Sequence, residues 1–369
     1  MRSATDPYHR FLCNCFRPDH AGARDLALAP SWSWERLFQR ANDESVLPAL
    51  AWAAKAGLDI SAPHDVADFL SAVLVLNRER NRWIWDELRT TIGLLNEIGI
   101  EPVLLKGAAY LADGVYCDAG ARYLVDLDLL LPEAQLNNGF QHLVENGFSY
   151  DTADRFGQFR HHYPPLQRAS VPIELHHGLG FGPCASILPA SEIIENARPI
   201  ELDGLRAHIP SPTHLVTHLV MHSQIHHPYN ERIWPPLRAM LDLAELQRHH
   251  SSSIAWAEVA RRFENAGQGT LFRLHLIDLG EALGIEPPVE RRFTPLMRIR
   301  RLRRHLLRQF PSLRYCDPLY MFSAVCLRRV RVVRNVLAAR GGLNCLVNQL
   351  LAWGVYQRFL LDILEGRGR

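Results

Sequence analysis

The pattern of apolar and polar positions predicts helical ends and a middle section in which strands and helices alternate. Apolar residues recur at steps of three and four over 31–54 and 65–98, so residues 1–95 are expected to be helical. After Pro210 the helical spacing returns, and Ser211-Pro212-Thr213 is typical of a helix start with a hydroxyl cap. Further helices are expected over 234–249, 254–266 and 342–364.

The middle section reads as a small α/β unit. Short apolar runs bounded by Gly and Pro predict strands at 102–105, 123–131, 148–150 and 171–176. Helical spacing between them predicts helices at 108–112 and 133–146. We therefore expect an α+β fold in three parts, a helical region 1–95, an α/β core 96–209 and a C-terminal helical region 210–369.

Composition narrows the class of protein. Of the 369 residues, 47% are hydrophobic and 22% charged, which is usual for a soluble globular protein. No uncharged apolar run of about 18 residues occurs, so we expect no membrane span, and the N-terminus does not resemble a secretory signal. Seven scattered cysteines favour free thiols in a reducing cytoplasm, with Cys13 and Cys15 as small apolar fillers rather than metal ligands.

Basic residues are unevenly distributed, although the net charge is only +2. The chain has 41 basic residues, and only Lys55 and Lys106 among them are lysines. Residues 291–340 contain 14 arginines against one acid, Asp317. Such a stretch can bind nucleic acid, an anionic membrane surface or an acidic partner, or it can form a solvated helix face.

Three acidic residues of the middle section are candidates for a metal site. Side chains alternate along a strand, so Asp126 and Asp128 are expected to point to the same face. Glu174 lies on a separate predicted strand and shares its face with His176. Carboxylates that meet repel each other unless a cation binds between them, and Mg²⁺ prefers oxygen ligands and substrate phosphates. The alternative is that the aspartates cap a turn or pair with Arg122.

The motifs around these acids resemble a known family. They are VLLKGAAY at 103–110, R-x3-D-x-D at 122–128, IELHH at 173–177 and the H-x11-W-x7-D pattern of 222–242. In combination they resemble the uncharacterised bacterial nucleotidyltransferase family of the DNA polymerase β-like superfamily, over residues 30–250. The resemblance implies a small mixed sheet of the nucleotidyltransferase type. It also implies a transfer of a nucleoside monophosphate from an NTP, expected to be ATP, with two Mg²⁺ or Mn²⁺ ions and release of pyrophosphate.

The same resemblance suggests roles for individual residues. It assigns Asp126, Asp128 and Glu174 to metal binding and catalysis, and Gly107 to the corner that holds the phosphates. Nucleotide-binding residues are expected to be Lys106, Gly107, Ala108 and Arg122.

The phosphate corner departs from the wider superfamily at one position. That superfamily has Gly-Gly or Gly-Ser at the corner, whereas this chain has Gly107-Ala108, so backbone N–H groups are left to hold the phosphates. Lys106 is expected either to neutralise triphosphate charge or to be a solvated lysine at a strand end. Arg122 is expected either to neutralise triphosphate charge as well or to orient Asp126.

A series of histidines follows the predicted helix start. His214, His218, His222 and His226 recur every four residues and would lie along one helix stripe. They form either a packed helix face or a zinc pair, and His222 is the best candidate to line the substrate cleft. Among the histidines near the third strand, His161, His162 and His176, the last is the best candidate because it shares a face with Glu174.

Trp234, Arg238 and Asp242 would share one helical face. Trp234 can stack on a base, and Asp242 can pair with Arg238 or act as a general base toward an acceptor hydroxyl. The other interpretation is a core tryptophan beside a surface ion pair.

The leading function is therefore a metal-dependent nucleotidyltransferase that acts on a small-molecule, peptide or protein acceptor. One alternative is a non-catalytic, antitoxin-like or regulatory binding protein that keeps the fold. The other is an RNA-directed transferase that uses the arginine-rich residues 291–340 to bind nucleic acid.

Overall fold

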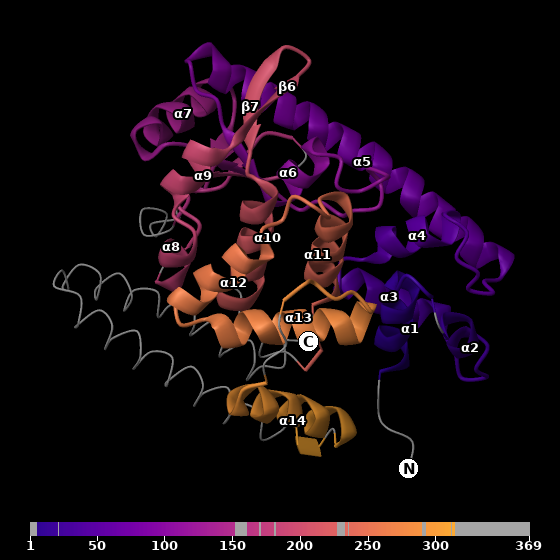
Figure 1. Ribbon diagram of the computed structural model, residues 1–369. Helices are drawn as coiled ribbons and strands as arrows, with labels where there is room; N and C mark the ends of the chain where they lie inside the picture. The colour runs from indigo at the N-terminus through magenta and orange to yellow at the C-terminus, as the bar shows by residue number, and fades with distance from the viewer. Residues whose placement is uncertain are drawn as a thin grey trace. The chain divides into compact units, whose positions relative to one another are not determined.

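The chain divides into two compact units, Asp6–Met297 and Met1–Thr5 with Arg298–Arg369. The computed structural model describes residues 6–20, 22–151, 161–169, 171–180, 182–226, 233–234, 236–289, 293–310 and 312–313. The first unit contains a β-sheet with helices packed on it, which confirms the expected α+β fold (Figure 1). The three-part division at residues 95 and 209 stays a prediction.

Seven strands in the described residues form one mixed sheet in the order β3-β4-β5-β2-β1-β7-β6. The strands are β1 (Val103–Leu105), β2 (Leu127–Leu130), β3 (Ser149–Tyr150), β4 (Leu166–Gln167), β5 (Ile173–His176), β6 (Arg198–Leu202) and β7 (Leu205–Ile209). β2 pairs in parallel with β5 and antiparallel with β1. Every residue of β1 and β2 is buried, so the centre of the sheet is covered on both faces.

In the sequence, helices precede the strands, lie between them and follow them. Before the sheet come α1 (Pro7–Phe16), α2 (Ala23–Ala27), α3 (Trp34–Asp43), α4 (Leu47–Lys55) and α5 (His64–Glu97). Among the strands lie α6 (Lys106–Ala112), α7 (Glu133–Glu145), α8 (Pro183–Ile187) and α9 (Ala190–Asn196). After them come α10 (Pro212–Met221), the π-helical turn η2 (His222–His226), α11 (Leu237–His249), α12 (Trp256–Asn265), α13 (Gly269–Leu283) and α14 (Pro295–Gln309).

Helix α5 links the N-terminal helices to the sheet. It packs on α4 near its start and on α7 and β7 near its end, and Figure 1 shows it as one long rod. Its buried residues accordingly belong to two cores: Leu70 and Leu74 to that of the N-terminal helices, Ile84 and Leu88 to that of the sheet. Cys13 and Cys15 are buried in the N-terminal core, where the sequence placed them as apolar fillers.

The expected start of α10 is confirmed. Ser211 is its N-cap, its Oγ accepts a hydrogen bond from the His214 N–H at 3.3 Å, and Pro212 occupies the first helical position.

Two predicted elements are shorter than expected. The strand predicted over 123–131 is only β2, Leu127–Leu130, and Tyr123 and Val125 before it are exposed. The helix predicted over 234–249 begins at Leu237, so Trp234 lies outside α11 and does not share a helical face with Arg238. The predicted helix at 342–364 lies outside the described residues, as does most of the arginine-rich stretch apart from α14.

The hairpin of β6 and β7 was not predicted. Leu202 pairs with Leu205 across the two-residue turn Asp203-Gly204, and both turn residues have positive φ, 53° and 84°. Asp-Gly is the sequence that such turns favour, so the signal was present in the chain. None of the described helices is both long and apolar enough to cross a membrane.

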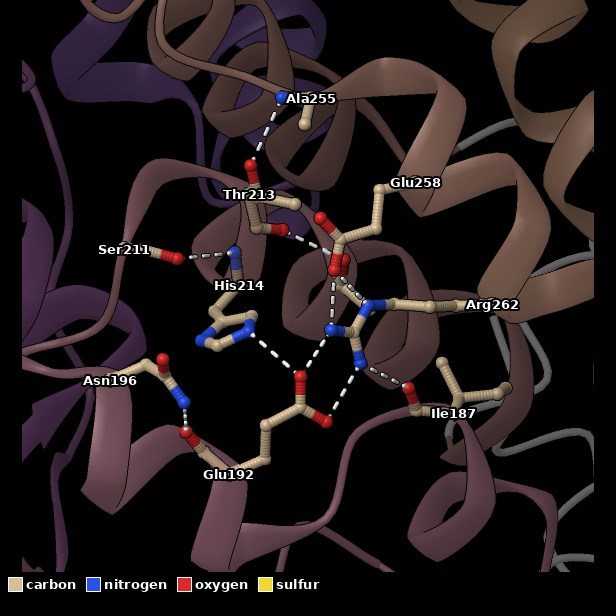
Figure 2. A network of polar contacts seen from close by, with 10 residues as sticks. Ile187, Glu192, Asn196, Ser211, Thr213, His214, Ala255, Glu258 and Arg262 are labelled. Atoms are coloured by element: carbon tan, nitrogen blue, oxygen red, sulfur yellow. Dashed lines mark hydrogen bonds and ion pairs between the residues drawn. The ribbon is translucent and has the colours of Figure 1, made fainter.

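An ion-pair network ties the end of the sheet region to the helices that follow it. Figure 2 shows the Arg262 guanidinium of α12 between the carboxylates of Glu192 on α9 and Glu258 on α12. His214 of α10 reaches Glu192 at 3.4 Å. Thr213 accepts a hydrogen bond from the Ala255 N–H at 3.0 Å. Three helices are thereby joined through one set of charges.

Candidate active site

The central strands bring the predicted acids together. In the register of β2 and β5, Asp128 lies directly beside Glu174, and in the register of β1 and β2 it lies opposite Leu105. Adjacent strands are only about 4.8 Å apart, so the two carboxylates must meet. Lys106 follows Leu105, the last residue of β1, so it begins next to Asp128 as well.

Asp128 is the most buried of the three acids, with 1% of its surface exposed. Its Oδ1 accepts hydrogen bonds from Lys106 Nζ at 2.6 Å and from His176 Nε2 at 2.8 Å. Burial would raise the pKa of Asp128, but Lys106 and His176 hold that pKa well below its ordinary value. Asp128 Oδ2, by contrast, is buried and has no hydrogen-bond partner among the described residues.

Asp126 is in the opposite electrostatic state. It lies just before β2 and is partly exposed. Burial and the neighbouring Asp128 carboxylate raise the pKa of Asp126 to about 6, and Glu174 acts in the same direction. Lys106 and Arg238 act in the opposite direction and offset these effects only in part.

His176 connects two of the acids. It shares a face of β5 with Glu174, as predicted, and its Nε2 lies 3.4 Å from Glu174 Oε2. Burial lowers the pKa of His176, but the hydrogen bonds to Asp128 and Glu174 raise it above its ordinary value. His176 Nε2 thereby joins the carboxylates of Asp128 on β2 and Glu174 on β5.

The phosphate corner predicted at Lys106 and Gly107 is the start of α6. Lys106 has a left-handed backbone with φ 45°, unusual for a residue with a side chain. A Cβ on Gly107 would lie 2.4 Å from Arg122 Nη1 and 2.6 Å from Leu124 Cδ2, so only glycine fits there. Ala108 is fully buried, and only its backbone can contribute to binding.

Arg122 binds Asp242 rather than Asp126. Its Nε and Nη2 donate to the two oxygens of Asp242 at 2.8 and 3.0 Å, and Tyr116 Oη donates to the same carboxylate at 2.5 Å. The sequence suggested Arg238 as the partner of Asp242, and the structure places Arg122 there instead. This buried pair anchors α11 to the segment that leads into β2.

Arg238 lies within electrostatic range of Asp242 and Asp126. It makes no hydrogen bond or ion pair of 4 Å or less with any described residue. Burial and the nearby Arg122 lower its pKa, while Asp242 and Asp126 counteract them. Trp234, expected beside it, instead lies with its ring centroid 4.6 Å from that of His9 in α1.

Comparison with known proteins agrees with this geometry. A family model described as an uncharacterised nucleotidyltransferase matches residues 30–279. The chain belongs to this nucleotidyltransferase family. Among solved structures, the chain is similar to an antigenic nucleotidyltransferase-like protein from Paracoccidioides brasiliensis, at 16% identity over 59% of this chain and 93% of that one, with a TM-score of 0.31. No curated protein matches the chain.

The nucleotidyltransferase has a chain of histidine rings beside its acids. Ring centroids lie 5.3 Å apart for His176 and His161, 4.8 Å for His161 and His226, and 5.3 Å for the stacked His226 and His222. The last pair belongs to η2, whose wider π-helical turn replaces the α-helix expected for the whole stripe. Such turns are frequent at functional sites.

His218 was missing from the predicted site residues. Burial, and then the nearby Lys106, lower its pKa to about 3, and Asp128 also acts on it. His218 also contacts the predicted His222, whose ring in turn stacks on His226. Its position four residues before His222 was the only sequence signal for it.

Two asparagines of α5 were also missed. Asn77 Nδ2 donates to the carbonyls of Gly120 and Arg122 at 2.7 and 3.1 Å, and Asn81 Nδ2 donates to those of Ala119 and Arg122 at 2.5 and 2.8 Å. Both asparagines are buried. They hold the segment before Asp126 in place of a strand partner, which explains why β2 is short.

A divalent ion fits the acidic site. Three groups of described residues have the composition and spacing to hold a metal, Asp128–Glu174–His176, Asp113–His249–His250 and Glu192–His214–Glu258. In the second and third groups an arginine already binds the carboxylates, Arg198 and Arg262 respectively. Among these groups, the first has a buried carboxylate oxygen without a hydrogen-bond partner, Asp128 Oδ2, and a neighbouring acid, Asp126, whose pKa is raised to about 6.

Proposed function

We propose that this nucleotidyltransferase moves a nucleoside monophosphate from an NTP, ATP in the first instance, to an acceptor that is a small molecule, peptide or protein. The observation that carries the proposal is the meeting of Asp126, Asp128 and Glu174 beside the Lys106-Gly107 corner. In the transfer, a bond forms between the acceptor and the α-phosphorus, and the bond from that phosphorus to pyrophosphate breaks.

Asp126, Asp128 and Glu174 would hold Mg²⁺ or Mn²⁺, which supplies a Lewis acid for the α-phosphate and the leaving pyrophosphate. The chain's own cations complete the site. Arg238, which has no ion-pair partner among the described residues, is placed to bind the triphosphate. His176 orients Asp128 and Glu174.

The burial of Asp128 and His176 favours the reaction. Asp128 and His176 are each 1% exposed, so water is excluded from the inner part of the site. Charges fixed in such surroundings stabilise developing charge more strongly than they would in water, and they need not reorganise during the transfer.

A transfer assay tests the proposal. The protein is incubated with Mg²⁺, each of the four labelled NTPs and either small-molecule or protein extracts as the acceptor source. We expect one NTP to give pyrophosphate and a labelled product, and Asp128→Asn to lower the rate by about 100-fold or more.

Glu133→Gln, at the exposed start of α7, is the matched control and should leave the rate unchanged. Full activity of Asp128→Asn would refute the assignment of the metal ligands. Absence of product with every NTP and both extracts would favour a non-catalytic binding protein.

A further inference from the structure

Helix α5 carries apolar side chains on a face that is open to solvent. Its other face is buried in the two cores described above. On the open face, Phe69, Val75, Leu76 and Trp83 are exposed, Leu76 by 68% and Trp83 by 59%. Single exposed apolar residues are common on any protein, whereas four large ones within 15 residues of one helix form a patch that marks a contact surface. We call these four residues the α5 patch.

Three residues of the α5 patch follow one line along the helix. Phe69, Leu76 and Trp83 are spaced by seven residues, which is nearly two helical turns, so they extend along one side of α5 for about 21 Å. Phe69 also packs against Phe38 of α3, with ring centroids 4.6 Å apart. Leu76 lies at the centre of the line, with one aromatic ring seven residues away on either side.

Charges of opposite sign lie at the two ends of the α5 patch. Asp68, Val75 and Arg82 each precede a residue of the first line by one position, so they form a second line beside it. Asp68 and Arg82 are both exposed. Arg82 binds Glu79 of its own helix at 2.6 Å, an exposed pair of the kind that contributes little and rearranges easily. The surface is therefore acidic at one end, apolar in the middle and basic at the other end.

Such a surface is complementary to a second copy of itself in the opposite direction. A two-fold axis near Leu76 places Leu76 against Leu76 of the second copy, and Phe69 against Trp83 of the second copy. The same axis brings Asp68 beside Arg82 of the second copy, and the symmetry forms this ion pair twice. A parallel arrangement would instead place like charges beside each other, which is unfavourable.

We propose that the α5 patch is a homodimer interface, in which the α5 helices of two copies pack antiparallel and cross at Leu76. The inference is independent of the proposed function. A strip about 21 Å long and about 10 Å wide, the diameter of a helix, is smaller than the roughly 800 Å² that each partner buries in a standard interface. The dimer should therefore dissociate on dilution.

Sedimentation of the full-length protein tests the interface. The mass is measured by analytical ultracentrifugation from about 1 to about 100 μM, the range in which a weak dimer dissociates. We expect the wild type to approach twice the mass of the chain at high concentration. Leu76→Glu should stay a monomer, because it places two carboxylates against each other on the two-fold axis. Leu28→Glu is the matched control, since Leu28 is 63% exposed at the end of α2, and it should dimerise like the wild type.

Charge reversal tests the antiparallel direction. Asp68→Arg and Arg82→Asp should each weaken self-association about tenfold at low salt, because each places like charges together twice in the dimer. An equal mixture of these two variants should form a heterodimer more tightly than either variant dimerises alone, because both ion pairs are then present again. Circular dichroism shows that each variant is folded. If Leu76→Glu does not fold, the two charge variants decide, since both of their positions are exposed.

Three results would overturn the inference. A wild type that stays monomeric at every concentration would mean that two copies do not associate through the α5 patch. A folded Leu76→Glu that still dimerises would place the interface elsewhere on the chain. A mixture of the charge variants that associates no better than its components would exclude the antiparallel arrangement.

Discussion

Two aspartates only two residues apart are in opposite electrostatic states. Asp128 has two cationic partners and a depressed pKa, whereas Asp126 has none within hydrogen-bonding distance among the described residues and a pKa raised to about 6. A raised carboxyl pKa means that ionisation of that group opposes folding, and a lowered pKa means that ionisation favours it. The same chemical change should therefore have opposite effects at the two positions.

We predict that Asp126→Asn stabilises the metal-free protein at pH 7, by about 2 kcal/mol, because it removes a charge that the neighbouring cations offset only in part. The stability that Asp126 contributes is fully present below its ordinary pKa of 3.8 and is lost as the pH rises through about 6. The stabilisation produced by Asp126→Asn should therefore disappear near pH 4. Asp128→Asn should destabilise by about 3–5 kcal/mol, because it leaves the buried His176 and the partly exposed Lys106 without their carboxylate partner.

Urea unfolding in the presence of EDTA at pH 7 and pH 4 measures both effects. A destabilised Asp126→Asn at pH 7 would show that Lys106 or Arg238 already compensates Asp126.

At the scale of elements, α5 positions the site although none of its residues touches the carboxylates in the contacts described above. Asn77 and Asn81 are one helical turn apart, and both amides donate to the carbonyl of Arg122. Arg78 of the same helix binds Asp118 at 2.6 Å. The helix therefore fixes the backbone from 118 to 122, from which β2 continues to the acids.

We predict that Asn81→Ala destabilises the protein by about 1–3 kcal/mol, because it removes the hydrogen bonds that the buried Asn81 amide donates to the Ala119 and Arg122 carbonyls. Amide hydrogen exchange should also become faster in the segment from 118 to 126. Asn138→Ala, at an exposed position of α7, is the control and should change neither quantity. Unchanged exchange in the Asn81 variant would show that Asn77 and Arg78 suffice to hold the segment.

At the scale of the first unit, the helices after the sheet are joined to it by charge as well as by apolar packing. Arg262 binds Glu192 and Glu258 and contacts the Ile187 carbonyl at 3.3 Å, so α8, α9 and α12 meet at one guanidinium. The buried Arg122–Asp242 pair makes a second connection, from α11 to the segment before β2. Both connections link residues at least 70 positions apart in the sequence.

We predict that Arg262→Ala raises the pKa of His214. Burial and then Arg262 now lower that pKa, and Glu192 opposes them, so removing the arginine leaves the histidine beside two uncompensated carboxylates. The His214 ring signal, assigned with His214→Gln, is followed by NMR over pH 4–8. Arg261→Ala changes the exposed neighbouring arginine and should leave the titration unchanged. An unaltered midpoint in Arg262→Ala would indicate that burial alone sets the His214 pKa.

Local patterns predicted the elements whose signals are short-range. The Gly and Pro boundaries, the apolar periodicity of α5 and the Ser211 cap all act within a few residues, and the structure confirms them. The Asp203-Gly204 turn was an equally local signal that was overlooked. The length of β2 was predicted wrongly because apolar residues at 123–125 resemble a strand, whereas Asn77, 43 and 45 residues earlier, holds the preceding backbone at Gly120 and Arg122.

The sequence by itself determined which chemistry is present: two aspartates in D-x-D spacing, a third acid beside a histidine and a lysine before a glycine, each on its own predicted strand. Only the tertiary structure decided which charges meet. Lys106 binds Asp128, and Arg122 binds Asp242. The physical reason is that strand pairing and helix packing choose partners among residues distant in the sequence, and burial then decides which of those charges remains uncompensated.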